Sequence, residues 1–414
     1  MNTENQQNSL SAIETKYDYF THTEWKRRFH KVKERIREKE IDGLLITSTE
    51  NIFYLTGFHT TGYYYFQCLY IPAHGNPFLL VRKMERLGAI TQSWMPEEQI
   101  HSYYDTEEPI QQLSHRIRET EQYALIGFEK KSALFPATIQ DKLKLMISSS
   151  EFVDVGGIVE TVRQTKSEQE LDLIRKTAYS TVEGIKAGIN SIKPGVKDNE
   201  IAANIYYQCF LSGGEYPACP SFVSVGERGA IGHSTWNGTT VKEGDLVFLE
   251  VSASRYRYHA PMMRTCYIGK SLPPLIKEAE EIIIKCLNEC KKEMKPGVPI
   301  CQVDLLSKQI LNQNSFGYTY DNRLGYSIGC AFAPGWGEDT VITIHSLEQR
   351  CFQENMVFHL IPFMMIPGIG TVGISETVIV KPYGAKATID YPQRIIAIPP
   401  DDLRETRETR ESKN

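Results

Sequence analysis

Residues 245–251 read DLVFLEV, and residues 355–361 read NMVFHLI. Both are apolar runs with the length of a buried strand, and each follows a helical segment that ends in the turn KPGV, at residues 193–196 and 295–298. A helix, a turn and a strand that recur in the same order indicate a duplicated half-domain. Such a duplication predicts a curved sheet between two pairs of helices, with a cleft at the pseudo-twofold centre.

Upstream of the duplicated region, the pattern is that of an α/β domain. Residues 23–40 carry apolar side chains at spacings of three and four, which predicts an amphipathic helix, and the apolar run 44–46 follows as a short buried strand. Similar alternation continues to Val155, and Gly156-Gly157 marks a boundary. The predicted parts are an α/β domain of residues 1–157, a duplicated domain of residues 162–400, and a tail of residues 401–414 that we expect to be disordered.

The composition argues against several classes of function. The 414 residues carry a net charge of −5, which gives no broad attraction to nucleic acid or to an anionic membrane. No apolar stretch is long enough to span a bilayer, and the polar residues 1–9 do not resemble a signal peptide. The nine cysteines are scattered and form no zinc set. We therefore expect a cytoplasmic protein with reduced thiols.

Three of the predicted strands carry an ionisable side chain inside an apolar run. Glu250 lies in LVFLEV, His359 lies in MVFHLI, and Glu376 lies in residues 373–380, GISETVIV. Burying a charged group costs several kcal/mol unless it is paired or hydrogen-bonded, so one such residue is usually structural. Three of them on strands of one duplicated domain favour a shared polar site.

Loops bounded by glycine add further candidates. His233 and Trp236 lie in residues 232–237, GHSTWN. Tyr326 lies in residues 325–329, GYSIG, where the glycines let the backbone approach a ligand closely. A lone loop histidine is more often solvated than catalytic, so the aromatic neighbour is what makes this loop a candidate.

Aromatic side chains indicate a cation-binding wall. The turn at 333–338, APGWGE, combines an aromatic ring with a carboxylate, and the first domain contains the run YYYF at 63–66. The latter run also suits a buried strand or a dimer contact. The candidate ligand-binding residues are Trp236, His359, Glu338, Trp336, Tyr65 and Phe66.

Taken together, these motifs resemble the pita-bread family, which includes aminopeptidase P, prolidase, creatinase and ectoine hydrolase. The resemblance implies a creatinase-like N-terminal α/β domain joined to a duplicated pita-bread domain, usually as a homodimer. The metal-free branch formed by creatinase and ectoine hydrolase looks closest. The motifs that carry the resemblance are ENIFYLTGF at 50–58, VRQTKSEQELDLIRKTA at 162–178, KPGV, GHSTW, RYHAP at 257–261, EGDLVFLE at 243–250, GYSIG, PGWGE, VFHLIP at 357–362 and GISETVIV.

Metallopeptidases of this family hold two metal ions with two aspartates, one histidine and two glutamates. The resemblance places Glu250 at the first aspartate position and Pro261 at the second. It places Tyr326 at the histidine position and Ile361 at the first glutamate position, and it keeps only Glu376. Proline and isoleucine offer no side-chain ligand, so we expect no metal and no other cofactor.

The substrates of the metal-free branch combine a delocalised C–N cation with a carboxylate. The carbon of such a cation is already electrophilic and needs less Lewis-acid help than a peptide carbonyl. Glu250 and Glu376 would pair with the cation or act on water, and Glu250 could also attack directly. His233 would protonate the leaving nitrogen, and Tyr326 would donate to developing oxygen charge. Candidate partners for the substrate carboxylate are Arg255, Arg257, Arg264 and Arg323.

The sequence therefore predicts a metal-independent hydrolase of a small cyclic amidine or guanidino substrate. Ectoine, opened to N-acetyl-diaminobutyrate, is the first choice. The alternatives are an Xaa-Pro dipeptidase or aminopeptidase, a creatinase, and a non-catalytic pita-bread protein that binds peptides. The aromatic run at 63–66 predicts a homodimer in which the first domain of one subunit closes the cleft of the other.

Overall fold

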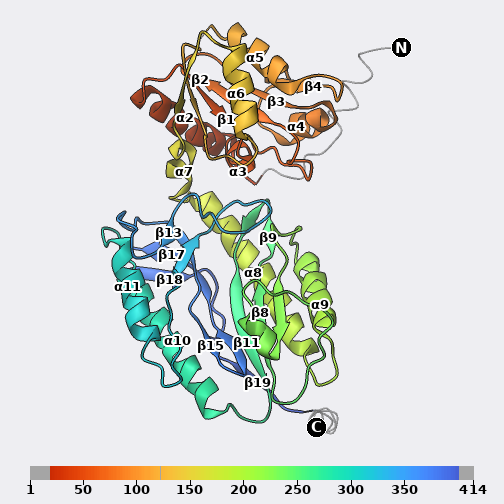
Figure 1. The fold of residues 1–414 in the computed structure, drawn as a ribbon, viewed down its shortest axis with the longest axis vertical. Coiled ribbons are helices and arrows are strands. Elements are labelled where there is room, and N and C mark those ends of the chain that lie inside the picture. The colour runs from red at the N-terminus through yellow and green to blue at the C-terminus, as the bar shows by residue number, and fades with distance from the viewer. Residues whose placement is uncertain (1–18, 122, 401–414) are drawn as a thin grey trace. The chain divides into compact units, whose positions relative to one another are not determined.

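A computed structural model describes residues 19–121 and 123–400, and the chain divides into two compact units, Met1–Arg163 and Gln164–Asn414 (Figure 1). The predicted tail at 401–414 lies outside the described residues. No helix among the described residues combines the length and the apolar character that a membrane crossing requires.

The first unit is built on one mixed sheet with the strand order β4-β3-β2-β1-β5-β6. Helix α2, His22–Glu38, has the predicted amphipathic face, because Trp25, Phe29, Val32 and Ile36 are all buried. The strands are β1 Gly43–Ile46, β2 Cys68–Pro72, β3 Phe78–Arg82, β4 Ile100–Tyr103, β5 Leu125–Phe128 and β6 Glu151–Asp154. The helices are α2 His22–Glu38, α3 Thr49–Thr56, η1 Lys83–Glu85, α4 Arg86–Gln92, η2 Glu97–Gln99, α5 Pro109–Glu119, α6 Ala137–Met146 and α7 Ile158–Arg163.

The second unit contains two half-domains, each a sheet with its own pair of helices (Figure 1). The first half has the strand order β19-β11-β8-β7 and the second β13-β12-β14-β17-β18. The first half and its β9-β10 hairpin comprise α8 Glu168–Ser191, α9 Asp198–Leu211, β7 Phe222–Val225, η3 Gly226–Ala230, β8 Leu246–Val251, β9 Ser254–Arg255, β10 Tyr258–His259, β11 Met262–Ile268 and β19 Ile396–Ile398. The second half and its β15-β16 hairpin comprise α10 Pro274–Glu293, α11 Ile300–Leu311, β12 Gly325–Ser327, β13 Thr343–Ile344, β14 Val357–Leu360, β15 Phe363–Ile366, β16 Gly370–Gly373, β17 Glu376–Lys381 and β18 Gly384–Ala387.

The two KPGV turns have the same backbone geometry. Gly195 and Gly297 adopt φ values of +90° and +89°, a left-handed conformation that favours glycine. Gly195 N–H donates to the carbonyl of Val241, and Gly297 N–H donates to the carbonyl of Phe352, each at 2.9 Å. The predicted duplication is therefore present in hydrogen bonding as well as in sequence.

Alternation along the strands determines which side chains face the helices. In β8, Val247, Leu249 and Val251 belong to the core under α8 and α9. In β14, Phe358 and Leu360 belong to the core under α10 and α11. The residues between them, Glu250 and His359 among them, consequently point away from both helix pairs.

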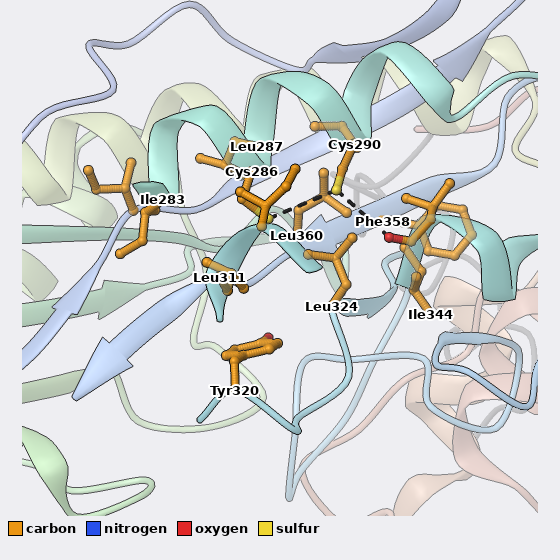
Figure 2. Packing of buried hydrophobic residues seen from close by; sticks show 14 of the residues in the cluster. Ile283, Cys286, Leu287, Cys290, Leu311, Tyr320, Leu324, Ile344, Phe358 and Leu360 are labelled. Atoms are coloured by element: carbon orange, nitrogen blue, oxygen red, sulfur yellow. Dashed lines mark hydrogen bonds between the residues drawn. The ribbon is translucent and has the colours of Figure 1, made fainter. Parts of the chain in front are cut away.

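The core of the second half-domain is formed by α10, α11 and the helix-facing side of the sheet. Figure 2 shows Leu287 and Cys290 of α10 packed over Phe358 and Leu360 of β14, all of them fully buried. The Sγ atoms of Cys286 and Cys290 lie 3.9 Å apart. These thiols are free, as are the other cysteines in the described part of the chain, and they act as packing groups in this core.

We predict that Leu287→Ala lowers the free energy of unfolding by about 2–5 kcal/mol, because the substitution removes buried methyl groups and leaves a cavity. Leu275→Ala is the matched control on the same helix, since Leu275 is 40% exposed and its truncation should change stability by less than about 0.5 kcal/mol. Urea unfolding measures both. Equal effects of the two substitutions would contradict the described packing of α10.

Candidate active site

Glu250 lies on the face of its sheet opposite the helices, between Phe222 of β7 and Met263 of β11. It is only 7% exposed. Its carboxylate makes no hydrogen bond to any residue that the structure describes, and its Oε1 lies 3.9 Å from Nδ1 of His359. Within the described residues, this carboxyl group therefore forms no structural hydrogen bond.

His359 is the centre of a buried hydrogen-bond chain. Its Nδ1 lies 2.9 Å from the hydroxyl of Tyr326, the residue paired with it across β12 and β14. Its Nε2 lies 2.6 Å from Oγ of Ser375. The chain is extended at both ends, because the indole N–H of Trp336 donates to the Tyr326 hydroxyl at 2.9 Å and the backbone N–H of Met263 donates to Ser375 Oγ at 2.6 Å.

Burial shifts all three titratable groups of this centre toward their neutral forms. Burial raises the pKa of Glu250 to about 8, and it lowers the pKa of His359 to about 3. Burial, reinforced by the nearby Glu250, holds the pKa of Tyr326 well above its ordinary value. At neutral pH the centre therefore carries little charge until a ligand enters, and a cationic ligand would stabilise the Glu250 carboxylate and favour loss of its proton to solvent.

Aromatic rings line this part of the sheet. The ring of Phe222 lies 5.4 Å, centroid to centroid, from both Trp336 and His233. Trp236 is not part of this group, because it packs against Tyr206 at 5.9 Å and against the core under α8 and α9. The sequence analysis did not identify Phe222. Its aromatic ring belongs to this group because Phe222 pairs with Glu250 across β7 and β8.

The structure does not bring the Glu376 carboxylate to Glu250 and His359. Its oxygens accept from Lys291 Nζ at 2.5 Å and from Gln393 Nε2 at 2.7 Å. Glu376 has the same strand parity as Val378, which faces α10, so its side chain points to the helix side of the sheet. Its neighbour Ser375, which the sequence analysis did not single out, has the opposite parity and supplies the polar group to the centre.

Glu338 holds the turn that carries Trp336 rather than facing the centre. Its carboxylate is almost fully buried and accepts from Lys166 Nζ at 2.7 Å and from Ser327 Oγ at 3.0 Å. Its backbone N–H donates to the carbonyl of Ser327. The buried ion pair therefore fixes the geometry of the indole that donates to Tyr326.

Of the four candidate arginines, Arg323 contacts Tyr326, with its guanidinium carbon 4.8 Å from the centre of the tyrosine ring. Arg323 pairs with Asp339 at 2.8 Å but is partly exposed, so it can still reach a ligand. The other three bond groups of the protein itself: Arg255 bonds Ser180, Arg257 bonds carbonyls of Tyr216 and Ala331, and Arg264 bonds carbonyls that include those of Met263 and Ser375.

Tyr65 and Phe66 belong to the first unit. Phe66 packs against the core of that unit, whereas Tyr65 is 38% exposed and lies under the guanidinium of Arg82, 4.0 Å from the ring centre. Within their own unit, Phe66 is a packing residue and Tyr65 is a surface aromatic.

Comparison with known proteins agrees with this architecture. The model of the metallopeptidase family M24 matches residues 172–382, and that of the creatinase/prolidase N-terminal domain matches residues 28–165. The chain belongs to the metallopeptidase family M24, with a creatinase-like first domain and a pita-bread second domain. The fold class predicted from the sequence is confirmed.

Among characterised relatives, the chain is 27% identical to the ectoine hydrolase of Halomonas elongata over 397 residues, covering 91% of this chain and 98% of the relative. It is 25% identical to the Xaa-Pro dipeptidase of Pyrococcus horikoshii, covering 86% of this chain and 95% of the relative. The crystal structure of the prolidase from Pyrococcus horikoshii OT3 superimposes with a TM-score of 0.78 at 24% identity, covering 89% of this chain and all of the other.

The family implies a metal centre, but the donors in this chain do not fit one. The described residues contain no group of three or more histidine, cysteine, aspartate or glutamate side chains that could hold a metal ion. Among the residues that the structure describes, Glu250 is the one carboxylate with a contact to His359, and both nitrogens of His359 are already hydrogen-bonded. One carboxylate beside an occupied imidazole is a poor substitute for the shared ligands of a paired-metal site.

The raised pKa of Glu250 predicts a distinctive pH dependence of stability. The folded chain keeps the Glu250 proton between the ordinary pKa of 4.5 and the raised value of about 8, whereas the unfolded chain loses it. The free energy of unfolding should therefore fall as the pH rises through this window, by up to about 1.4 kcal/mol per pH unit. Glu250→Gln cannot ionise, so it should lack this part of the slope and gain relative stability at pH 8.

Urea unfolding of both proteins between pH 4.5 and pH 9 measures the difference. Glu243→Gln is the control, since it removes the same charge from an exposed position in the turn before β8. An unchanged slope in Glu250→Gln would show that the carboxyl group is not desolvated as described.

Proposed function

We propose that this chain is a hydrolase of a small cationic substrate with a delocalised C–N bond, with ectoine as the preferred substrate, and that it works without a bound metal. The observation that carries the proposal is the buried, unbonded carboxyl group of Glu250 beside Tyr326 and His359. The scissile bond of a peptide is neutral, whereas an amidinium carries its positive charge on the carbon and nitrogens that react.

Recognition of the substrate follows from charge and shape. An amidinium that enters the dry centre would stabilise the Glu250 carboxylate and lower its pKa toward the ordinary value. Phe222 and Trp336 can cover the flat face of the cation, a contact that is strengthened where water is excluded. The partly exposed Arg323 is the best-placed partner for the substrate carboxylate.

The reaction would add water across the amidinium C–N bond. Glu250, ionised by the bound cation, takes a proton from water as the oxygen bonds to the amidinium carbon, or it attacks that carbon itself and water then releases the acyl group. Tyr326 donates to the oxygen that gains charge. The ring C–N bond then breaks as the new hydroxyl loses its proton to become the amide carbonyl, and His233, an exposed residue on the Phe222 side, supplies a proton to the departing nitrogen. The proton taken up by Glu250 and the one lost by the hydroxyl then restore His233 and convert the amine to its ammonium form. For ectoine the product is an N-acetyl-diaminobutyrate.

Hydrolysis of Xaa-Pro dipeptides is the second candidate. Membership of a metallopeptidase family and the resemblance to Xaa-Pro dipeptidases favour it. The set of donors around Glu250 argues against it, because peptide hydrolysis in this family relies on metal ions that these side chains do not suit.

The substrate assay decides between these candidates. We predict that protein treated exhaustively with EDTA opens ectoine to an N-acetylated diaminobutyrate, as followed by NMR, and leaves Xaa-Pro dipeptides intact. Creatine and hydroxyectoine in parallel reactions define the range of cations accepted. Turnover of a dipeptide that is lost on chelation and restored by manganese, zinc or cobalt would refute the proposal.

Variants of the centre give matched controls for that assay. Glu250→Gln should be nearly inactive because it lacks both charge and basicity, while Glu376→Gln, on the helix side of the same unit, should retain most turnover. His233→Ala should lower kcat by roughly 10²-fold or more if it is the general acid. Comparable losses in Glu250→Gln and Glu376→Gln would argue that both effects are structural.

We also propose that the chain acts as a homodimer. The first unit exposes several large apolar residues, and two of them, Tyr65 and Tyr104, lie under the charged groups of Arg82 and Lys83. We propose that these residues form one surface patch. Large apolar patches that are exposed on a single chain commonly mark sites of protein–protein interaction. The patch consists of Tyr64, Tyr65, Met84, Leu87 and Tyr104, which are between 38% and 78% exposed.

Analytical ultracentrifugation should therefore find a dimer, and replacing Tyr64 and Tyr65 together by serine should weaken it at least tenfold in Kd. Tyr383→Ser is the control, because Tyr383 is 94% exposed but lies in the second unit. A fully active monomer would rule out this assembly.

A further inference from the structure

We infer that Ser375 fixes the proton of His359 on Nδ1, so that the hydroxyl of Tyr326 can only donate into the centre. Ser375 is thus a positioning residue for Tyr326. The assignment of protons rests on geometry alone, whereas its consequence for catalysis rests on the proposed function.

The argument starts at the serine hydroxyl, which has one proton to donate. Ser375 Oγ has two partners among the described residues: the backbone N–H of Met263, which can only donate, and Nε2 of His359. Ser375 is fully buried, so water cannot take its proton. Its hydroxyl is satisfied only if it donates to Nε2 of His359.

The opposite arrangement places a proton on Nε2 and leaves the serine O–H without an acceptor. It leaves Tyr326 satisfied instead, since the phenol would then donate to Nδ1 of His359. The two arrangements differ in where the unused donor lies. Ser375 is 0% exposed, whereas Tyr326 is 7% exposed and faces the Glu250 side. A ligand or water can therefore accept the proton of the Tyr326 hydroxyl but not that of the Ser375 hydroxyl.

With Nε2 as an acceptor, the single proton of a neutral imidazole is on Nδ1 and is donated to the Tyr326 oxygen. The indole N–H of Trp336, a donor only, points at the same oxygen. Both acceptor positions of the phenol are thus filled, and its own proton is directed to a third group. Tyr326 therefore donates to the oxygen that gains charge as the reaction proceeds, and its hydrogen bond acts in the transition state rather than on the bound substrate.

The test reads the tautomer directly, in the full chain labelled with ¹⁵N-histidine. His359→Gln identifies the resonances of His359 by their loss. We expect the ¹⁵N shifts of wild-type His359 to be those of a neutral imidazole protonated on Nδ1. A neutral imidazole protonated on Nε2, or an imidazolium, would overturn the inference. The tautomer is measured without any substrate. The inference about Ser375 can therefore be refuted while the proposed function holds, and the proposed function can be refuted while the inference holds.

Two variants link the tautomer to turnover. Ser375→Ala removes the hydroxyl donor and should move the His359 proton toward Nε2, with a fall in kcat of roughly 10²-fold and little change in KM. Ser375→Thr keeps the hydroxyl and should restore both the Nδ1 tautomer and most of kcat. A Ser375→Ala protein that keeps the wild-type tautomer would exclude the serine as its cause.

Discussion

Period-two alternation of side chains in β8 and β14 is the constraint on which the rest of the second unit depends. One set of alternate residues forms the two helix-covered cores, and the other set brings Glu250 and His359 face to face. The orientation of the polar residues is therefore fixed, because a strand cannot turn them away from the centre without also moving its core residues out of the apolar core.

The sequence predicted the fold well because helix and strand periods, the repeated KPGV turn and the apolar strands are all local signals. Glu250, His359 and Tyr326 could also be identified, since each interrupts an apolar or glycine-bounded run. Glu376 shows the limit of such reasoning, because an ionisable residue in a strand can face either side. Only the strand register shows that Ser375 reaches the centre and that Glu376 reaches Lys291.

Loop residues were harder to predict for a related reason. Trp236 and Trp336 look equivalent in the sequence, yet one packs under α8 and α9 and the other bonds Tyr326. Glu338 looked like a ligand-binding carboxylate, but its partner Lys166 lies 172 positions away in the chain. Phe222 carries no motif at all, and its role arises from pairing with Glu250. Contacts between distant segments determine these roles, and a single sequence does not record them.

The pairing of Lys166 with Glu338 sets a limit on how the protein can be dissected. Lys166 lies just inside the second unit, whose first residue is Gln164, and its side chain is 1% exposed. A truncated chain that starts after Lys166 would leave the Glu338 carboxylate buried without its cation, and removing one partner of a buried pair destabilises a fold strongly. Expression of the second unit by itself, or a circular permutation that opens the chain at this junction, has to retain Lys166 together with α8.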